Sequence, residues 1–175
     1  MLVPVKSFSQ AKVRLAGVLD AAQRAALARA MAEHVLAAAT PHPVTVACDD
    51  DEVAAWARAA GASVCWTPGL GLNGAVAAGV QVLAGHERVL VAHADLPKAT
   101  SFDEVLEPSG VVAVPDRHDD GTNVLVVPPG AGFAFAYGPG SFARHLAEAA
   151  RLGLPATVLR PASLTWDVDV PADLL

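Results

Sequence analysis

The chain has 175 residues, of which 53% are apolar, and a formal net charge of −6. This length suits one domain, residues 1–175, and no apolar run reaches the roughly 18 residues that a membrane span needs. Because phosphate backbones are held mainly by clustered cations, the negative charge without a Lys/Arg stripe argues against nucleic acid as a partner. The N-terminal MLVPVKSFSQ has no export signal, so we expect a cytoplasmic protein.

The first half of the chain predicts strands that alternate with helices. Asp20 and Gln23 form a capping-box pattern before a helical apolar repeat, and Pro41 ends that helix. Short β-branched runs bounded by Pro, Gly or acidic residues predict the strands. We expect strands at 3–6, 44–48, 63–66 and 89–92, and helices at 21–39, 51–60 and 73–84.

The second half continues this alternation. It predicts a short helix near 101–107, strands at 111–114, 123–127, 157–159 and 164–168, a helix from 141 to 152 and a short terminal helix from Pro171. Most of these strands are apolar on both faces, which is typical of a mainly parallel sheet covered on both sides. The predicted fold is therefore α/β, a three-layer α/β/α sandwich.

In such sheets, ligands bind beyond the carboxyl ends of the strands. Asp95 stands at the end of the run RVLVAHADLP, where a carboxylate suits Mg²⁺, which prefers oxygen ligands and substrate phosphates. The alternative is that Asp95 caps a helix. Asp167 and Asp169 lie two residues apart in an extended stretch, so both point to one face, as a metal ligand and its support. Either could instead cap the terminal helix, Asp169 more so than Asp167.

Three further segments could bind a nucleotide or an anion. Lys6, Lys12 and Arg14 lie within nine residues of each other, although a solvated face would look the same. The glycine-rich stretch 69–75 contains Asn73 and ends where a helix begins, so its backbone could approach a nucleotide. Ser141 opens a helix after two glycines, where an anion or a simple N-cap fits equally well.

Six motifs in chain order resemble one known family. They are PVKxxxxAKxRL at 4–15, GLNGA at 71–75, ADLP at 94–97, PDRxxxGTNxL at 115–125, YGPGSFxxH at 137–145 and DVDxPxDL at 167–174. The family is the 2-phospho-L-lactate or phosphoenolpyruvate guanylyltransferase of coenzyme F420 biosynthesis. The resemblance implies a Rossmann-like fold of the nucleotide-diphospho-sugar transferase type. It also implies transfer of GMP from GTP to the phosphate of a three-carbon phospho-acid.

The resemblance also implies roles for individual residues. Nucleotide binding falls to Lys6, Lys12, Arg14, Asn73 and Gly74. Thr122, Gly138 and Ser141 would bind the carboxylate end of the phospho-acid. Mg²⁺ binding falls to Asp95, Asp167 and Asp169, and catalysis to Lys12, Asp95 and Asp167.

The acceptor and the oligomeric state are less well defined. The Ala-rich composition favours a bacterial source and hence phosphoenolpyruvate, or otherwise 2-phospho-L-lactate, as the acceptor. A homodimer is one option, and the short termini are expected to affect stability and oligomer contacts more than chemistry. Two alternatives remain open from the residues: a metal-dependent sugar-nucleotide glycosyltransferase and a non-catalytic nucleotide sensor.

Overall fold

The computed structural model describes residues 1–174, which form one seven-stranded sheet in the order β3-β2-β1-β4-β6-β5-β7. The strands are β1 (Leu2–Pro4), β2 (Thr45–Cys48), β3 (Ser63–Trp66), β4 (Val89–Ala92), β5 (Val111–Pro115), β6 (Thr122–Val127) and β7 (Ala156–Val158). The α-helices are α1 (Ala21–Ala38), α2 (Asp51–Ala59), α3 (Gly71–Val82), α4 (Asp103–Leu106) and α5 (Ser141–Arg151). Short 3₁₀ helices are η1 (Phe8–Gln10), η2 (Val13–Leu15), η3 (Pro129–Ala131) and η4 (Pro171–Asp173).

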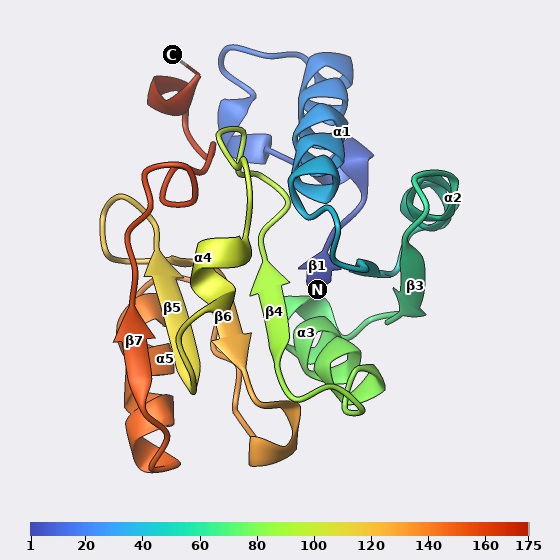
Figure 1. Ribbon diagram of the computed structural model, residues 1–175. Helices are drawn as coiled ribbons and strands as arrows, with labels where there is room; N and C mark the ends of the chain where they lie inside the picture. The colour runs from blue at the N-terminus through green and yellow to red at the C-terminus, as the bar shows by residue number, and fades with distance from the viewer. Residues whose placement is uncertain (175) are drawn as a thin grey trace.

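The sheet is mainly parallel, as predicted. β1 pairs in parallel with β2 and β4, and β5 with β7, whereas β6 runs antiparallel to both of its neighbours, β4 and β5. The start of β6 therefore lies at the same edge as the carboxyl ends of β4 and β5 (Figure 1). This reversal brings Thr122, the first residue of β6, to the edge where ligands are expected.

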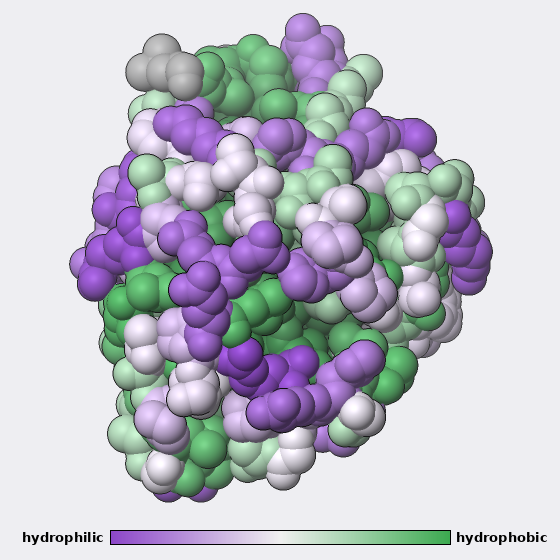
Figure 2. All heavy atoms as spheres, in the orientation of Figure 1, coloured by the Kyte–Doolittle hydropathy of each residue, from purple (hydrophilic) through white to green (hydrophobic). Residues whose placement is uncertain are grey.

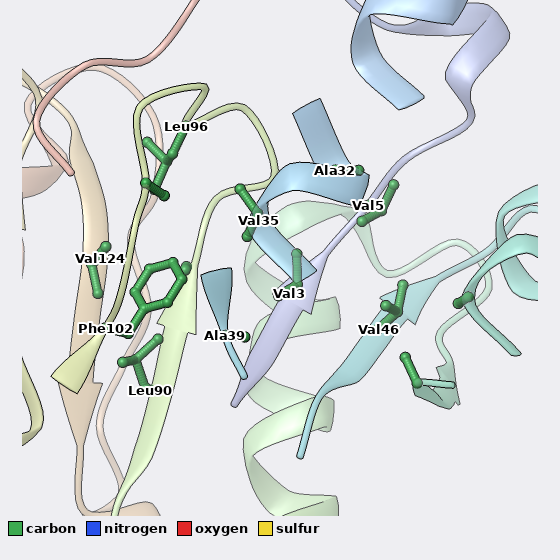
Figure 3. Packing of buried hydrophobic residues seen from close by; sticks show 14 of the residues in the cluster. Val3, Val5, Ala32, Val35, Ala39, Val46, Leu90, Leu96, Phe102 and Val124 are labelled. Atoms are coloured by element: carbon green, nitrogen blue, oxygen red, sulfur yellow. The ribbon is translucent and has the colours of Figure 1, made fainter. Parts of the chain in front are cut away.

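Two hydrophobic cores cover the two faces of the sheet. Alternate residues of one strand enter different cores: Val3 packs with residues of α1, α2 and α4, whereas Leu2 packs with residues of α3 and α5. Figure 3 shows the first core, where Phe102 and Leu90 lie beside the β4–β6 pair and Val35 of α1 faces β1. The predicted three-layer α/β/α sandwich is confirmed.

The start of α1 follows the predicted capping box. The Asp20 side chain accepts a hydrogen bond from the Gln23 backbone at 2.8 Å, and the Gln23 side chain accepts one from the Asp20 backbone at 2.9 Å. These bonds satisfy two amide groups that a helix start would otherwise leave unpaired.

Three predicted elements differ from the structure. β1 ends at Pro4, two residues before its predicted end. No strand forms at 164–168: the backbone N–H groups of Leu164 and Thr165 donate to the Pro161 carbonyl, and irregular chain follows. Leu164 is fully buried in the core, although it belongs to no strand. The apolar composition of this segment therefore reflects burial and not strand pairing. Helix α3 begins at Gly71, two residues before the predicted start, so Asn73 and Gly74 lie in its first turn.

Across residues 1–174, no helix combines the length and the apolar character that crossing a membrane requires. On the face that Figure 2 shows, hydrophilic and hydrophobic residues are mixed. Cys48 and Cys65 are both buried free thiols.

The contact between α3 and β1 depends on a glycine. A Cβ atom on Gly79 would lie 2.5 Å from Cδ1 of Leu2, which is fully buried, so the added methyl group would displace a packed core side chain. Gly79→Ala is therefore expected to lower the free energy of unfolding by about 1–3 kcal/mol, despite the better helix propensity of Ala. Urea denaturation measures this, with Gly85→Ala as the control because nothing lies within 4 Å of its added Cβ. Equal stability of the two variants would contradict this packing.

Candidate active site

A pocket of about 380 Å³ opens at the carboxyl edge of the sheet, next to β1 and β4. Its polar lining combines side chains from the N-terminal segment with side chains that follow β4. The lining residues with charged or polar side chains are Lys6, Gln10, Lys12, Arg14, His93, Asp95 and Asp169. All three basic residues of the N-terminal motif therefore reach one pocket, together with two of the three predicted metal ligands.

Asp95 is the most enclosed of the predicted metal ligands, with a side chain 19% exposed. Its Oδ2 is paired with Nζ of Lys12, whereas its buried Oδ1 has no hydrogen-bond partner among residues 1–174. Burial by itself raises the pKa of this carboxyl, but the Lys12 ammonium and then His93 outweigh burial and hold the pKa below its usual value. Asp95 caps no helix, because α4 begins only at Asp103, so the capping interpretation is wrong.

Lys12 joins two of the carboxylates. Its Nζ donates to Asp95 and, at 3.1 Å, to Oδ1 of Asp169, while Arg14 reaches Oδ2 of Asp169 at 3.4 Å. Burial lowers the pKa of Lys12, but the two carboxylates outweigh burial and raise it, so Lys12 stays charged. Its backbone has φ 53°, a left-handed conformation that is uncommon outside glycine and clusters at functional sites.

Asp169 is thus an ion-pair partner of Lys12 and Arg14, and the interpretation that its carboxylate caps the terminal helix is wrong. The carboxylate that bonds to the start of η4 is that of Asp173, which accepts from the backbone N–H groups of Asp169 and Val170.

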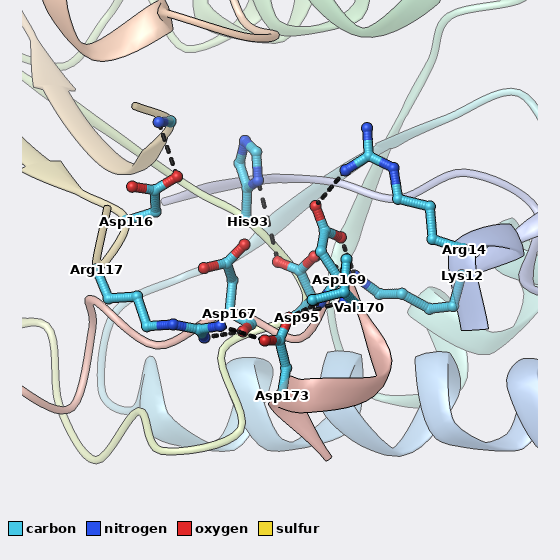
Figure 4. Close-up of polar contacts among 11 residues, drawn as sticks. Lys12, Arg14, His93, Asp95, Asp116, Arg117, Asp167, Asp169, Val170 and Asp173 are labelled. Carbon is cyan, nitrogen blue, oxygen red and sulfur yellow. Dashed lines mark hydrogen bonds and ion pairs between the residues drawn. The ribbon is translucent and has the colours of Figure 1, made fainter. Parts of the chain in front are cut away.

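Asp167 lines a second pocket, of about 350 Å³, on the other side of Asp169. Burial first, and then the charges of Asp95, Asp169 and Asp116, raise the pKa of Asp167, so its carboxylate lies in a negative environment. The backbone N–H of Val168 donates to the Asp95 carbonyl at 3.3 Å, which ties the two acidic segments together. Figure 4 shows Asp167, Asp95 and Asp169 in one row, with Lys12 and Arg14 at one end.

These carboxylates fit a divalent cation. Asp95 has a buried oxygen without a partner, and Asp167 has a raised pKa that a nearby cation would lower. Among residues 1–174, no three His, Cys, Asp or Glu side chains are arranged to hold a metal ion by themselves. Mg²⁺ does not need such a cage, because it usually takes one or two carboxylates together with water and substrate phosphates.

Asn73 is engaged with the backbone of the opposite loop. Its Oδ1 accepts from the Tyr137 N–H at 2.6 Å, and its Nδ2 donates to the Tyr137 carbonyl at 3.4 Å. These bonds connect α3 to the loop that precedes α5. The residue before Asn73 in the chain, Leu72, lines the larger pocket. The predicted contact of Asn73 and Gly74 with the nucleotide stays a prediction.

Thr122 and Ser141 meet in a buried cluster. Their hydroxyl oxygens lie 3.3 Å apart, and Thr122 Oγ1 lies 3.0 Å from Nδ1 of His145, which is fully buried. Gly138, with φ 120°, accepts a hydrogen bond at its carbonyl from the Ser141 N–H. The three residues predicted to bind the phospho-acid thus lie together, and their contact with a substrate stays a prediction.

The start of α5 is occupied by a carboxylate of the protein itself. Asp120 accepts from the Gly140 N–H at 3.0 Å through Oδ1, and from the Phe142 N–H at 3.0 Å through its backbone carbonyl. Two backbone N–H groups at the predicted anion site, those of Gly140 and Phe142, therefore already donate hydrogen bonds to Asp120 in this structure.

His145 gives the fold a specific response to acid. The Ala136 N–H donates to Nε2 of His145 at 3.0 Å, so Nε2 carries no proton. Burial, helped by Arg144 and His93, lowers the pKa of His145 from 6.5 to about 4. The unfolded chain therefore binds more protons between these pH values, and the free energy of unfolding should fall by as much as about 3 kcal/mol as pH drops from 6.5 to 4.

Guanidinium denaturation at a series of pH values measures this slope. His145→Gln should flatten the slope between pH 6.5 and 4, and His34→Gln, which changes an exposed histidine of α1, should keep it. A wild-type slope in His145→Gln would refute this role.

Three residues near the carboxylates were not singled out by sequence reasoning. His93 lies 3.9 Å from Oδ1 of Asp95 and lines the larger pocket. Arg117 and Asp173 pair with each other behind Asp167. Arg117 and Asp173 lie within the PDR and DVDxPxDL motifs, which are the signal that could have found them.

Comparisons with known proteins show the family of this chain. The family model described as "Guanylyl transferase CofC like" matches residues 1–175. A phosphoenolpyruvate guanylyltransferase of Sphaerobacter thermophilus is 39% identical over 99% of this chain and 89% of its own length, and one of Roseiflexus sp. is 38% identical over 99% and 82%. A nucleotide-diphospho-sugar transferase structure from Desulfovibrio desulfuricans G20 covers 99% of this chain and 83% of its own, with a TM-score of 0.75 and 18% identity. The chain belongs to the CofC-like guanylyltransferase family and is a nucleotidyltransferase.

Proposed function

We propose that the protein transfers GMP from GTP to the phosphate of a three-carbon phospho-acid, phosphoenolpyruvate before 2-phospho-L-lactate, with release of pyrophosphate. The relatives named phosphoenolpyruvate guanylyltransferase support this acceptor. The observation that carries the proposal is the row of alternating charges formed by Asp95, Lys12, Asp169 and Arg14. This row lies at the wall that the two pockets share, because Arg14 and Asp169 line both.

We place the nucleotide in the larger pocket. Its lining brings Lys6, Lys12 and Arg14 to one side, where cations can hold the triphosphate, and it also contains apolar residues of η1, α1 and α3. The phospho-acid would enter from the Asp167 side, with its carboxylate end toward Thr122, Gly138 and Ser141. The α-phosphate and the incoming phosphate then meet beside Asp95.

The reaction needs positioning and charge compensation more than acid–base chemistry. A phosphate oxygen of the acceptor, already ionised at pH 7, attacks the α-phosphorus of GTP, and the bond from that phosphorus to the oxygen bridging it to the β-phosphate breaks, so that pyrophosphate leaves. Two unit charges 4 Å apart at an effective dielectric of about 20 interact by about 4 kcal/mol, so uncompensated reactants would repel each other.

The side chains divide this task between them. Lys12 and Arg14 would neutralise the leaving pyrophosphate, and Asp95 and Asp167 would hold Mg²⁺, with Asp169 as a further ligand. When bound, Mg²⁺ supplies positive charge to the phosphate oxygens. Activity should therefore require a divalent cation.

A pyrophosphate-release assay tests the proposal. The protein is incubated with GTP and Mg²⁺ and, separately, phosphoenolpyruvate, 2-phospho-L-lactate and 3-phosphoglycerate, with EDTA as the control. We expect release with phosphoenolpyruvate that EDTA abolishes. Release of GDP from a GDP-sugar in the presence of a sugar acceptor would instead support the glycosyltransferase alternative, and binding without turnover would support the sensor. Cytoplasmic location and a homodimer stay predictions.

A further inference from the structure

Arg117 and Asp173 lie within the six motifs but have no part in the proposed function. They meet at residues 166–173, here named the acid loop because it carries Asp167 and Asp169. Residues 166–170 form neither helix nor strand, and only η4 follows. No regular backbone pattern therefore fixes the two carboxylates, and their direction depends on the contacts that hold the acid loop.

Asp173 binds the acid loop from within. It is 4% exposed, and its Oδ2 accepts hydrogen bonds from the backbone N–H groups of Asp169 at 2.7 Å and Val170 at 2.8 Å. Its Oδ1 is paired with the guanidinium of Arg117. Both carboxylate oxygens are thus used, and a buried carboxylate of this kind fixes the backbone beside Asp169.

Arg117 holds the acid loop at two further points. Its guanidinium carbon lies 4.4 Å from the ring centroid of Trp166, and its Nη1 donates to the Asp167 carbonyl at 3.4 Å. Together with the pair to Asp173, these contacts span the loop from residue 166 to residue 173. In the view of Figure 4, Arg117 reaches the loop from one side, and Lys12 and Arg14 reach it from the other.

The segment that carries Arg117 is itself firmly held. The Asp116 carboxylate accepts from the backbone N–H groups of His118 at 2.9 Å, Asp120 at 3.0 Å and Gly121 at 2.8 Å. Asp116 follows β5 directly, so Arg117 projects from a closed turn at the edge of the sheet. A side chain anchored in this way can transmit a fixed geometry to the acid loop.

We propose that Arg117 and Asp173 are positioning residues, which set the distance of the Asp167 and Asp169 carboxylates from Asp95. The inference rests on the proposed function, in which these three carboxylates serve a divalent cation. Arg117 and Asp173 contribute no ligand themselves; they act by holding the backbone on which two ligands stand. Removal of such supporting partners of a metal site typically costs about 10- to 100-fold in metal affinity or activity.

The test measures Mn²⁺ binding by electron paramagnetic resonance, together with kcat and KM for pyrophosphate release. Arg117→Met and Asp173→Asn should each weaken Mn²⁺ binding and lower kcat by about 10- to 100-fold, with a smaller change in KM for the phospho-acid. Arg117→Lys keeps a charge beside Asp173 and should recover part of the loss. The double variant should lose less than the product of the two single losses, because both residues act through one contact.

Arg160→Met is the matched control. Arg160 is also an arginine that follows a strand at this edge, but its side-chain hydrogen bonds go to Asp119, at 3.1 Å and 3.3 Å, and not to the acid loop. We expect wild-type Mn²⁺ binding and kcat from this variant. If Arg117→Met fails to fold, by circular dichroism, then Arg117→Lys and Asp173→Asn decide the question in the same two measurements.

The outcomes separate the two proposals. Wild-type Mn²⁺ affinity and kcat in the folded variants would overturn the positioning role, and so would a rise in KM for the phospho-acid alone, since that would make Arg117 a substrate contact. Absence of Mn²⁺ binding and of pyrophosphate release in the wild-type protein would refute the proposed function itself.

Discussion

Asp95→Asn is expected to lower kcat for pyrophosphate release by about 1,000-fold or more. The loss of one preorganised electrostatic contact in an active site costs about 100- to 1,000-fold, and here the substitution would also remove charge from the cation site. Folding should change little, by about 1 kcal/mol, because Asn keeps an acceptor oxygen and Lys12 retains Asp169 as a partner. Single-turnover kinetics measure the effect on the reaction, and urea denaturation measures the effect on the free energy of unfolding.

Asp51→Asn is the control for this variant. Asp51 is an exposed aspartate in the first turn of α2, where its loss should cost a few tenths of a kcal/mol and leave kcat unchanged. An Asp95→Asn protein with wild-type kcat would leave Asp95 as an ion-pair partner of Lys12 without a part in the chemistry.

Lys12→Met is expected to separate cation binding from turnover. In the structure the Lys12 ammonium lies against Asp95 and Asp169, where it neutralises the carboxylates that we assign to a divalent cation. Without Lys12 the cation has no competitor, so Mn²⁺ should bind more tightly to the nucleotide-free variant than to the wild-type protein. Turnover should nevertheless fall by about 100- to 1,000-fold, because the triphosphate loses its most enclosed cation.

Thermal stability gives a second measure of the same substitution. Removal of one partner of a buried ion pair typically costs about 3–5 kcal/mol, so Lys12→Met should melt earlier than the wild-type protein in EDTA. Mg²⁺ should restore more of that loss in the variant than it adds to the wild-type protein. Arg151→Met, which removes an exposed partner of Glu148 on α5, is the control and should show no such gain. An equal rise in melting temperature with Mg²⁺ in all three proteins would contradict competition between Lys12 and the cation for the carboxylates.

Most of the fold was predictable from local patterns. The Asp20–Gln23 capping box and the apolar strands appear in the structure near their predicted positions, because capping and burial act over a few residues. The reversal of β6 was not predicted, although residues 116–121 between β5 and β6 are too few for a parallel crossover and favour antiparallel pairing. The segment 164–168 has strand composition, but Leu164 is buried by packing and the chain turns there.

The site was predictable in its residue types and less so in its contacts. The rule that ligands gather at strand ends located Asp95 and the N-terminal basic residues at one pocket. The pair between Lys12 and Asp95 joins residues 83 positions apart, and such a pairing cannot be read from spacing. The same limit hid Arg117 and Asp173, which lie 56 positions apart.

The central claim is that Asp95 and Asp167 serve one divalent cation. Paramagnetic broadening of backbone amide signals by substoichiometric Mn²⁺ tests this claim most directly. We predict that the signals of residues 93–96 and 166–170 broaden together, and that those of the acidic residues 49–51 do not. Broadening at only one of the two acidic segments, or at residues 49–51 in place of them, would contradict the claim.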